Sequence, residues 1–91
     1  MAGPVRSMRM RHASGSVGTT YTKIKVKRGI GQYLRLRNTD DVDNLLVSFD
    51  NGRNYNTMEP NEVLEINALF HFIVLLGAAA DVTYELLIGE G

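Results

Sequence analysis

The sequence has no cysteine and no tryptophan, and it has only two histidines among its 91 residues. Without cysteine, the chain can form no disulfide bond and no thiolate metal site, and it has no cysteine nucleophile. Two histidines are too few for a histidine-rich metal site, and aromatic residues make up only 8% of the chain. We therefore expect one small domain with a core of Leu, Ile and Val, and with neither a metal nor any other cofactor.

Long hydrophobic runs are also missing. The longest extends from Leu69 to Leu76, whereas a helix that spans a bilayer needs about 20 apolar residues. Residues 1–19 lack the apolar stretch of a secretory signal and mix Gly, Ser, Pro and Arg with few bulky apolar side chains. We therefore expect no membrane association, and we predict a basic flexible N-terminal arm over residues 1–19 and a β-sandwich domain over residues 20–91.

Acidic residues are absent from the first 37 residues, although the formal net charge of the whole chain is zero. Those residues carry nine lysines and arginines, whereas residues 38–91 carry ten acidic residues and one arginine. Three interpretations are open. Strands from the two halves lie side by side and neutralise each other, the positive half engages an acidic surface on a neighbouring subunit, or the basic residues bind nucleic acid.

Alternation of apolar and polar residues predicts short β-strands after the arm, separated by turn residues. The apolar run of residues 69–76 is typical of a central strand covered on both faces. We find no helical pattern and predict an all-β fold, a small antiparallel β-sandwich (jelly-roll or immunoglobulin-like) or a barrel. The sequence predicts about seven short strands, over residues 20–27, 33–37, 45–49, 55–57, 63–66, 69–76 and 82–88.

Asp50-Asn51-Gly52 is the strongest hairpin signal in the chain. A two-residue Asn51-Gly52 turn would pair Val47 with Asn56. A three-residue loop with a left-handed Gly52 would instead pair Val47 with Tyr55. We prefer the three-residue loop, because it places similar side chains opposite each other on the two strands.

None of the short motifs that could carry chemistry is complete. Residues 29–31 (Gly-Ile-Gly) lack the rest of a phosphate-binding fingerprint, and residues 40–43 (Asp-Asp-Val-Asp) lack the Gly and Glu of a calcium loop. His71 lies within the apolar run, so we expect it to be buried or at an interface. We therefore identify no catalytic, cofactor-binding or metal-binding residue, and we expect a protein that acts by contact and is not an enzyme.

The order of these features resembles a group of small β-rich virion proteins of tailed bacteriophages. The similarity covers roughly residues 33–90, from the Ser48–Gly52 hairpin through the Pro60 turn and the small-residue loop at 77–80 to the final strand. This chain departs from the group at Asn51 and at Pro60-Asn61, where Gly and Pro-Gly are more usual. Both changes are compatible with the turns, since Asn tolerates positive φ.

The resemblance implies a structural protein of the virion that sits on or between capsid or tail subunits in many copies. We expect a capsid cement or decoration subunit whose partners are the major capsid protein or other virion proteins, and further copies of the chain, for instance in a trimer. A tail, neck or baseplate component and a small β-barrel that binds nucleic acid are the alternatives. The candidate contact residues are cations of the first half: Arg6, Arg9, Arg11, Lys23, Lys25, Lys27, Arg35 and Arg37.

Overall fold

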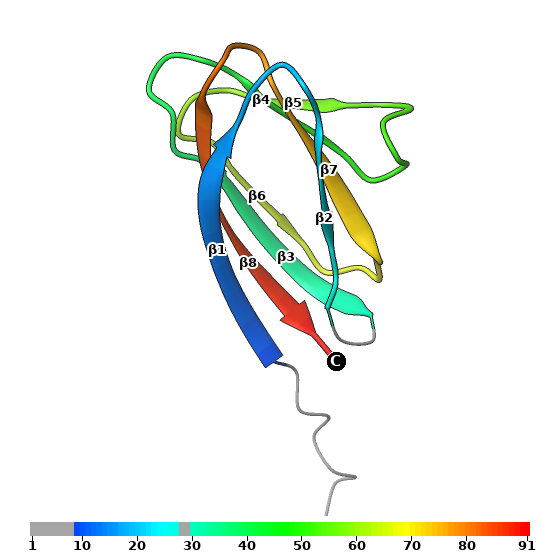
Figure 1. Cartoon of the computed structure of the whole chain (residues 1–91). Helices are drawn as coiled ribbons and strands as arrows, with labels where there is room; N and C mark the ends of the chain where they lie inside the picture. The colour runs from blue at the N-terminus through cyan, green and yellow to red at the C-terminus, as the bar shows by residue number, and fades with distance from the viewer. Residues whose placement is uncertain (1–8, 28–29) are drawn as a thin grey trace, which may run out of the picture.

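The computed structural model describes residues 9–27 and 30–91, and this part of the chain consists of β-strands, turns and loops. The predicted all-β fold is confirmed, with eight strands among the described residues where about seven were predicted. The strands are β1 (Arg9–Val17), β2 (Thr22–Lys25), β3 (Gly31–Asn38), β4 (Leu45–Ser48), β5 (Asn56–Met58), β6 (Val63–Ile66), β7 (Phe72–Gly77) and β8 (Val82–Glu90) (Figure 1).

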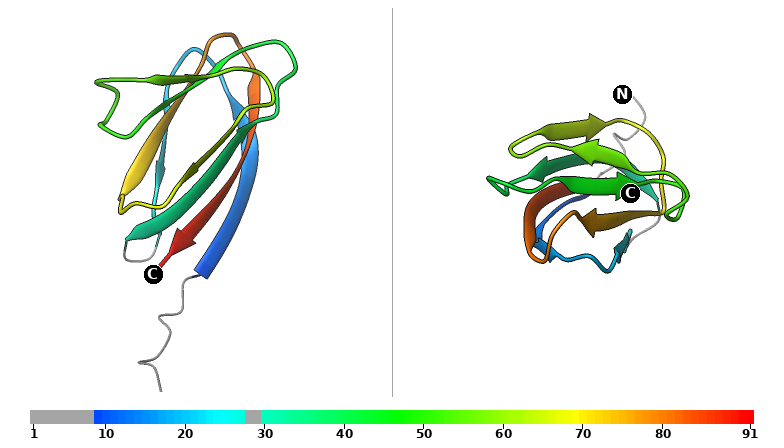
Figure 2. Two further views of the ribbon diagram at one scale, coloured as in Figure 1. Left: turned by 180° about the vertical axis from the view of Figure 1, so that it is seen from behind. Right: turned by 90° about the horizontal axis from the view of Figure 1, so that it is seen from above.

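The strands form two antiparallel four-stranded sheets. Sheet A has the order β1-β8-β3-β6, and sheet B has the order β2-β7-β4-β5. The two sheets face each other as layers of a sandwich (Figure 2). This strand order is that of a jelly roll, in which two Greek keys fold over one another. It therefore distinguishes the jelly roll from the immunoglobulin-like alternative, whose sheets combine other strands.

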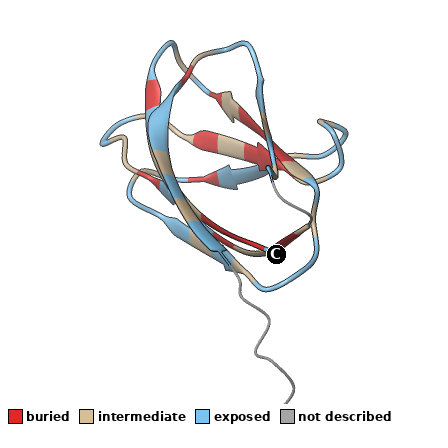
Figure 3. Ribbon diagram, turned by 60° about the horizontal axis from the view of Figure 1, so that its bottom comes forward, coloured by how far each residue is buried: buried red, intermediate tan, exposed pale blue. Residues whose placement is uncertain are grey.

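The core between the sheets is aliphatic, as the scarcity of aromatic residues predicts. Leu34 and Leu36 of β3 are fully buried, whereas Arg35 and Arg37, which alternate with them, are exposed. Buried residues lie along the strands of both sheets (Figure 3). The core consists of Val17, Leu34, Leu36, Leu45, Val47, Met58, Ile73, Leu75, Val82, Leu86 and Ile88.

The predicted N-terminal arm is wrong for residues 9–17, because these residues form β1. This strand pairs along its whole length with β8, from Arg9 opposite Glu90 to Val17 opposite Val82. The side chain of Val17 is only 2% exposed and belongs to the core. Small residues are tolerated here because β8 supplies the hydrogen bonds and the other strands supply the apolar surface. The domain therefore includes residues that were assigned to the arm, and residues 1–8, with Arg6, lie outside the described part.

The hairpin between β4 and β5 adopts the register of a two-residue turn. Val47 pairs with Asn56, so the preferred three-residue register is wrong. The left-handed conformation predicted for Gly52 is confirmed at φ 86°, but Asn51 also has positive φ, at 62°. Two consecutive residues with positive φ are typical of a type I′ turn, which explains the register.

Strand β7 lies between β2 and β4, at the centre of sheet B. The side chains of residues 73–75 are at most 2% exposed, which confirms a strand covered on both faces. The strand begins at Phe72, because residues 67–71 are needed to cross from β6 in sheet A to sheet B. Leu69 is accordingly 70% exposed, and His71 is exposed, so His71 is not buried within the domain, and its predicted place at an interface stays a prediction.

Candidate interaction surfaces

The candidate contact residues do not gather on one face of the described domain. Arg6 lies outside the described residues. Arg9 is exposed at the start of β1, and Lys27 is exposed just after β2. Of the others, Arg11 makes a contact inside the fold, Lys23 and Lys25 lie on the outer side of sheet B, and Arg35 and Arg37 lie on the outer side of sheet A.

Arg11 makes an ion pair inside the fold. Its Nε donates a hydrogen bond to Oε1 of Glu90 at 2.8 Å, and its Nη2 donates to the carbonyl of Lys25 at 3.0 Å. Glu90 is only 3% exposed, and its Oε2 accepts a hydrogen bond from the backbone N–H of Lys27 at 2.6 Å. These bonds join β1, β8 and the end of β2 at one edge of the sandwich. Arg11 therefore stabilises the domain rather than presenting a free cation.

Lys23 and Lys25 lie on β2, the edge strand of sheet B. Both are exposed, whereas Ile24 between them packs against the core. The Nζ of Lys23 lies 4.3 Å from the centroid of the Phe72 ring, which is a cation–π contact. Because the two sheets are opposite layers, these lysines and the arginines of β3 point to opposite sides. The single basic surface that the nucleic-acid alternative requires is therefore not formed by these residues.

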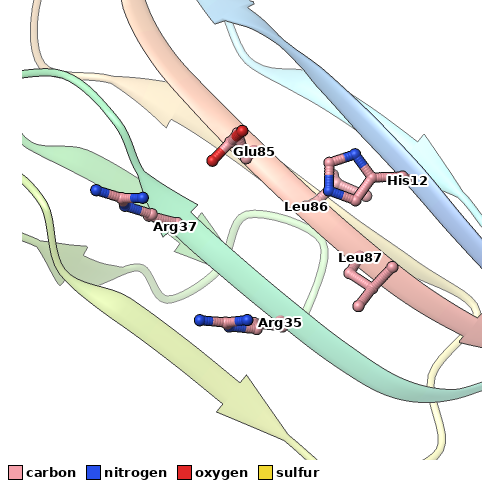
Figure 4. Close-up of a pocket in the computed structure, with 6 residues that line it drawn as sticks. All are labelled: His12, Arg35, Arg37, Glu85, Leu86 and Leu87. Carbon is pink, nitrogen blue, oxygen red and sulfur yellow. The ribbon is translucent and has the colours of Figure 1, made fainter.

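Arg35 and Arg37 project from the outer face of sheet A, which we call face A. The strand register defines two neighbouring rows across this face. One row brings His12, Leu87, Arg35 and Glu65 side by side, and the other brings Ser14, Glu85, Arg37 and Val63 side by side. A hollow of about 150 Å³ on face A is bordered by His12, Arg35, Arg37, Glu85, Leu86 and Leu87 (Figure 4).

Face A carries charges of both signs, but its arginines form no ion pair with a described residue. Arg35 faces Glu65 across the β3–β6 pair, and Arg37 faces Glu85 across the β3–β8 pair. Within the described residues, the bond between Arg11 and Glu90 is the one salt bridge found. The carboxylate of Glu65 instead accepts a hydrogen bond from the Tyr33 hydroxyl at 2.5 Å, which raises the pKa of Tyr33.

The first interpretation of the charge asymmetry is therefore confirmed in part. Strands from the positive and negative halves do lie side by side, since β8 lies between β1 and β3 in sheet A. Neutralisation by direct contact is limited to Arg11 and Glu90 among the described residues. The guanidinium groups of Arg35 and Arg37 remain exposed and available for another acidic group.

The loop between β3 and β4, residues 39–44, is organised by Asp40. Its Oδ2 accepts hydrogen bonds from the backbone N–H groups of Val42 at 3.1 Å and Asp43 at 2.7 Å. The hydrogen bond from Asp43 contributes most to lowering the pKa of Asp40, and the bond from Val42 contributes next. This arrangement leaves Val42 79% exposed, and the carboxylates of Asp41 and Asp43 have no hydrogen-bond or ion-pair partner among the described residues.

An apolar surface lies where the chain crosses from sheet A to sheet B. A hollow of about 420 Å³ opens there, and Leu69 at its border is the most exposed of its large apolar side chains. We call this the crossover surface. It consists of Phe49, Ile66, Ala68, Leu69, Phe70, His71 and Phe72.

Sequence reasoning missed His12, Glu85 and the exposed tip of the β3–β4 loop as parts of candidate interaction surfaces. His12 was missed because residues 1–19 were assigned to the arm. Residues 10–17 do alternate between the two sides of β1, but Ala and Gly on the inner side make this period weak. Within the described residues, no three His, Asp or Glu side chains come together in a way that could hold a metal ion.

No protein-family model and no curated protein matches this chain. Among solved structures, the chain is similar to a de novo designed double-stranded β-helix determined by NMR in solution. The two share 17% sequence identity with a TM-score of 0.52, over 91% of this chain and 99% of the designed chain. At this identity the likeness concerns the fold alone, and it agrees with the jelly-roll order of the strands.

Proposed function

We propose that this chain is a non-enzymatic structural protein of a bacteriophage particle, and that it acts as a capsid cement or decoration subunit. The observation that carries the proposal is the jelly-roll strand order, β1-β8-β3-β6 over β2-β7-β4-β5. Jelly rolls are frequent among capsid proteins. The turns on which the resemblance to phage virion proteins depends also fall between strands of this fold, with positive φ at Asn51 and Asn61.

The exposed surfaces of the domain are consistent with a protein that acts by binding to other subunits. Val42 is 79% exposed and Leu69 is 70% exposed, and each has an exposed polar residue close by in the chain, Asp41 for Val42 and His71 for Leu69. A small domain gains stability when a neighbouring subunit covers such apolar side chains, because binding favours the folded state. The proposed partners are the major capsid protein or another virion protein, and further copies of this chain.

The alternative of a nucleic-acid-binding barrel has less support. In that alternative the phosphates would be bound by Lys23, Lys25, Lys27, Arg35 and Arg37. Arg35 and Arg37 lie on sheet A, whereas Lys23 and Lys25 lie on β2 of sheet B and Lys27 follows just after β2. Affinity for a polyanion depends on how many phosphates are neutralised at once. Cations on opposite layers cannot contact the same stretch of a duplex, so the number of simultaneous contacts is small.

A particle-binding experiment tests this function. Phage particles from the source of the chain are prepared with and without it, and their heat-induced DNA release is measured. We expect particles without the chain to release DNA at a lower temperature, and purified chain to bind their heads in many copies and to restore the release temperature. Binding confined to the tail would replace the cement assignment by a tail component, and a chain that binds no part of the particle would contradict the proposal.

A further inference from the structure

We propose that copies of this chain bind one another head to tail. In this contact the tip of the β3–β4 loop, residues 41–43 (Asp-Val-Asp), docks on the hollow of face A beside Arg35 and Arg37 of the next copy. The inference deepens the proposed function and rests on it for the setting in which copies meet, since it identifies the surfaces through which a virion subunit would contact its own kind.

The receiving surface presents two arginines with matched orientation. Arg35 and Arg37 are two residues apart on β3 and project from the same side, so their Cα atoms are separated by roughly 6–7 Å. Both side chains are exposed, and neither forms a salt bridge with a described residue. Leu87, which is half-buried, lies beside Arg35 in the same row and gives the hollow an apolar part (Figure 4).

The docking segment has the complementary pattern. Val42 is the most exposed large apolar side chain of the described residues, and it is flanked by Asp41 and Asp43, whose carboxylates have no described partner. The hydrogen bonds to Asp40 hold this tip in one shape before binding. Little conformational entropy is then lost on docking, which favours association.

The two surfaces match in charge and in apolar character. Each carboxylate of the tip can accept two parallel N–H···O bonds from a guanidinium, which is the strongest geometry for this pair of groups. Val42 would cover Leu87 in the hollow. The two arginines lie on β3, and each has an acidic neighbour in its row, since Glu65 on β6 is opposite Arg35 and Glu85 on β8 is opposite Arg37. Repulsion from these two carboxylates keeps the incoming aspartates over the arginines of β3 and sets the orientation of the contact.

A second copy is the favoured occupant because the chain itself carries the acidic tip, and no cation of the described residues pairs with it. The two surfaces are different, so the contact is heterologous. Such contacts close into rings, of which a trimer is one, or continue as filaments. A ring would also place the positive half of one copy near the negative half of the next, as the second interpretation of the charge asymmetry expects.

Charge reversal in solution tests the contact. The full chain is compared with Arg35→Glu/Arg37→Glu and with Asp41→Lys/Asp43→Lys by sedimentation and light scattering over a range of concentrations. We expect the native chain to self-associate and each reversed variant to weaken this at least tenfold. An equal mixture of the two variants should associate again, because the native aspartates of one variant meet the native arginines of the other and the introduced lysines meet the introduced glutamates. A variant with all four substitutions should self-associate for the same reason.

Matched controls separate this contact from a general charge effect. Lys25→Glu/Arg53→Glu reverses two exposed cations away from both surfaces and should leave self-association within twofold of the native chain. Circular dichroism should show each variant folded. A native chain that stays monomeric up to about 1 mM, or reversed variants that do not complement each other in the mixture, would overturn the head-to-tail contact.

The same variants distinguish failure of the contact from failure of the proposed function. A chain that binds phage heads but remains monomeric alone, with no effect of the reversals, keeps the virion function and contradicts the head-to-tail contact. A chain that associates and complements as expected but binds no particle keeps the contact and contradicts the virion function. Self-association that is unaffected by reversal of the arginines, together with lost binding to short DNA, would assign face A to nucleic acid and overturn the proposal.

Discussion

At the scale of single residues, Asp50 shapes the loop of the β4–β5 hairpin. Its carboxylate accepts hydrogen bonds from the side-chain amide of Asn54 at 2.7 Å, from the backbone N–H of Asn54 at 2.8 Å and from the Ser48 hydroxyl at 2.7 Å. The Asn54 side chain contributes most to lowering the pKa of Asp50 to about 2, followed by the Asn54 backbone and by Ser48. These bonds lie in the segment between the end of β4 at Ser48 and the start of β5 at Asn56, where the two strands are not paired by backbone hydrogen bonds.

The lowered pKa predicts how the stability of the chain depends on pH. The charged carboxylate of Asp50 stabilises the fold at pH values above its ordinary pKa of 3.8, and this contribution is lost as the pH falls toward about 2. We expect Asp50→Asn to lower the urea midpoint at pH 7, and we expect the difference from the native chain to shrink between pH 4 and about 2. Asp81→Asn, which removes an exposed carboxylate, should leave the midpoint at pH 7 unchanged. A difference that is constant down to pH 2 would show that the charge of Asp50 does not stabilise the loop.

At the scale of elements, β1 is an integral part of sheet A. It pairs with β8 over nine residues and places Val17 in the core. We therefore expect a chain without residues 1–19 to lose its cooperative thermal transition, followed by circular dichroism. A chain without residues 1–8 keeps every described strand and should melt within a few degrees of the native chain. If the chain without residues 1–19 also melts cooperatively at the native temperature, β1 contributes little to the fold.

The bond between Arg11 and Glu90 connects the beginning of the chain to its end. Arg11→Met keeps a long apolar side chain but removes the guanidinium that pairs with a carboxylate of 3% exposure. We expect a loss of about 2–3 kcal/mol in the free energy of unfolding in urea, at the lower end for a broken buried pair because Arg11 is 23% exposed. Arg9→Met on the exposed part of β1 is the control and should change this free energy by less than about 0.5 kcal/mol. An equal loss of unfolding free energy in both variants would contradict a stabilising role for the ion pair between Arg11 and Glu90.

At the scale of the whole molecule, the two layers divide the cations between opposite sides. Lys23 and Lys25 lie on sheet B, and Arg35 and Arg37 lie on sheet A. We therefore expect weak binding to single- and double-stranded DNA at physiological salt, measured by fluorescence anisotropy with labelled oligonucleotides. Micromolar affinity with a steep decrease as salt is raised would instead favour the nucleic-acid alternative. A chain with Lys23→Gln/Lys25→Gln and one with Arg35→Gln/Arg37→Gln would then show which layer binds.

The prediction of the elements from sequence succeeded where the local pattern was strong. Residues 63–66 were predicted as a strand and form β6, and the alternation of Leu34 and Leu36 with arginines gave the correct inner face of β3. It failed at β1, where the residues that face inward include Ala and Gly and so carry little periodic signal. It also failed at the start of β7, which begins at Phe72 instead of Leu69 and leaves His71 exposed, because an apolar run does not reveal where the chain leaves one sheet for the other.

The sequence by itself determined the all-β class, the aliphatic core and the tight turns at Gly52 and Asn61, because period-two alternation and backbone preferences are local properties. Only the tertiary structure decided which strands are neighbours. Antiparallel pairing places His12 beside Leu87, and Arg35 beside Glu65, although these residues are far apart in the chain. The charges that share face A, and the separation of the lysines from the arginines, follow from this non-local register, which no local pattern encodes.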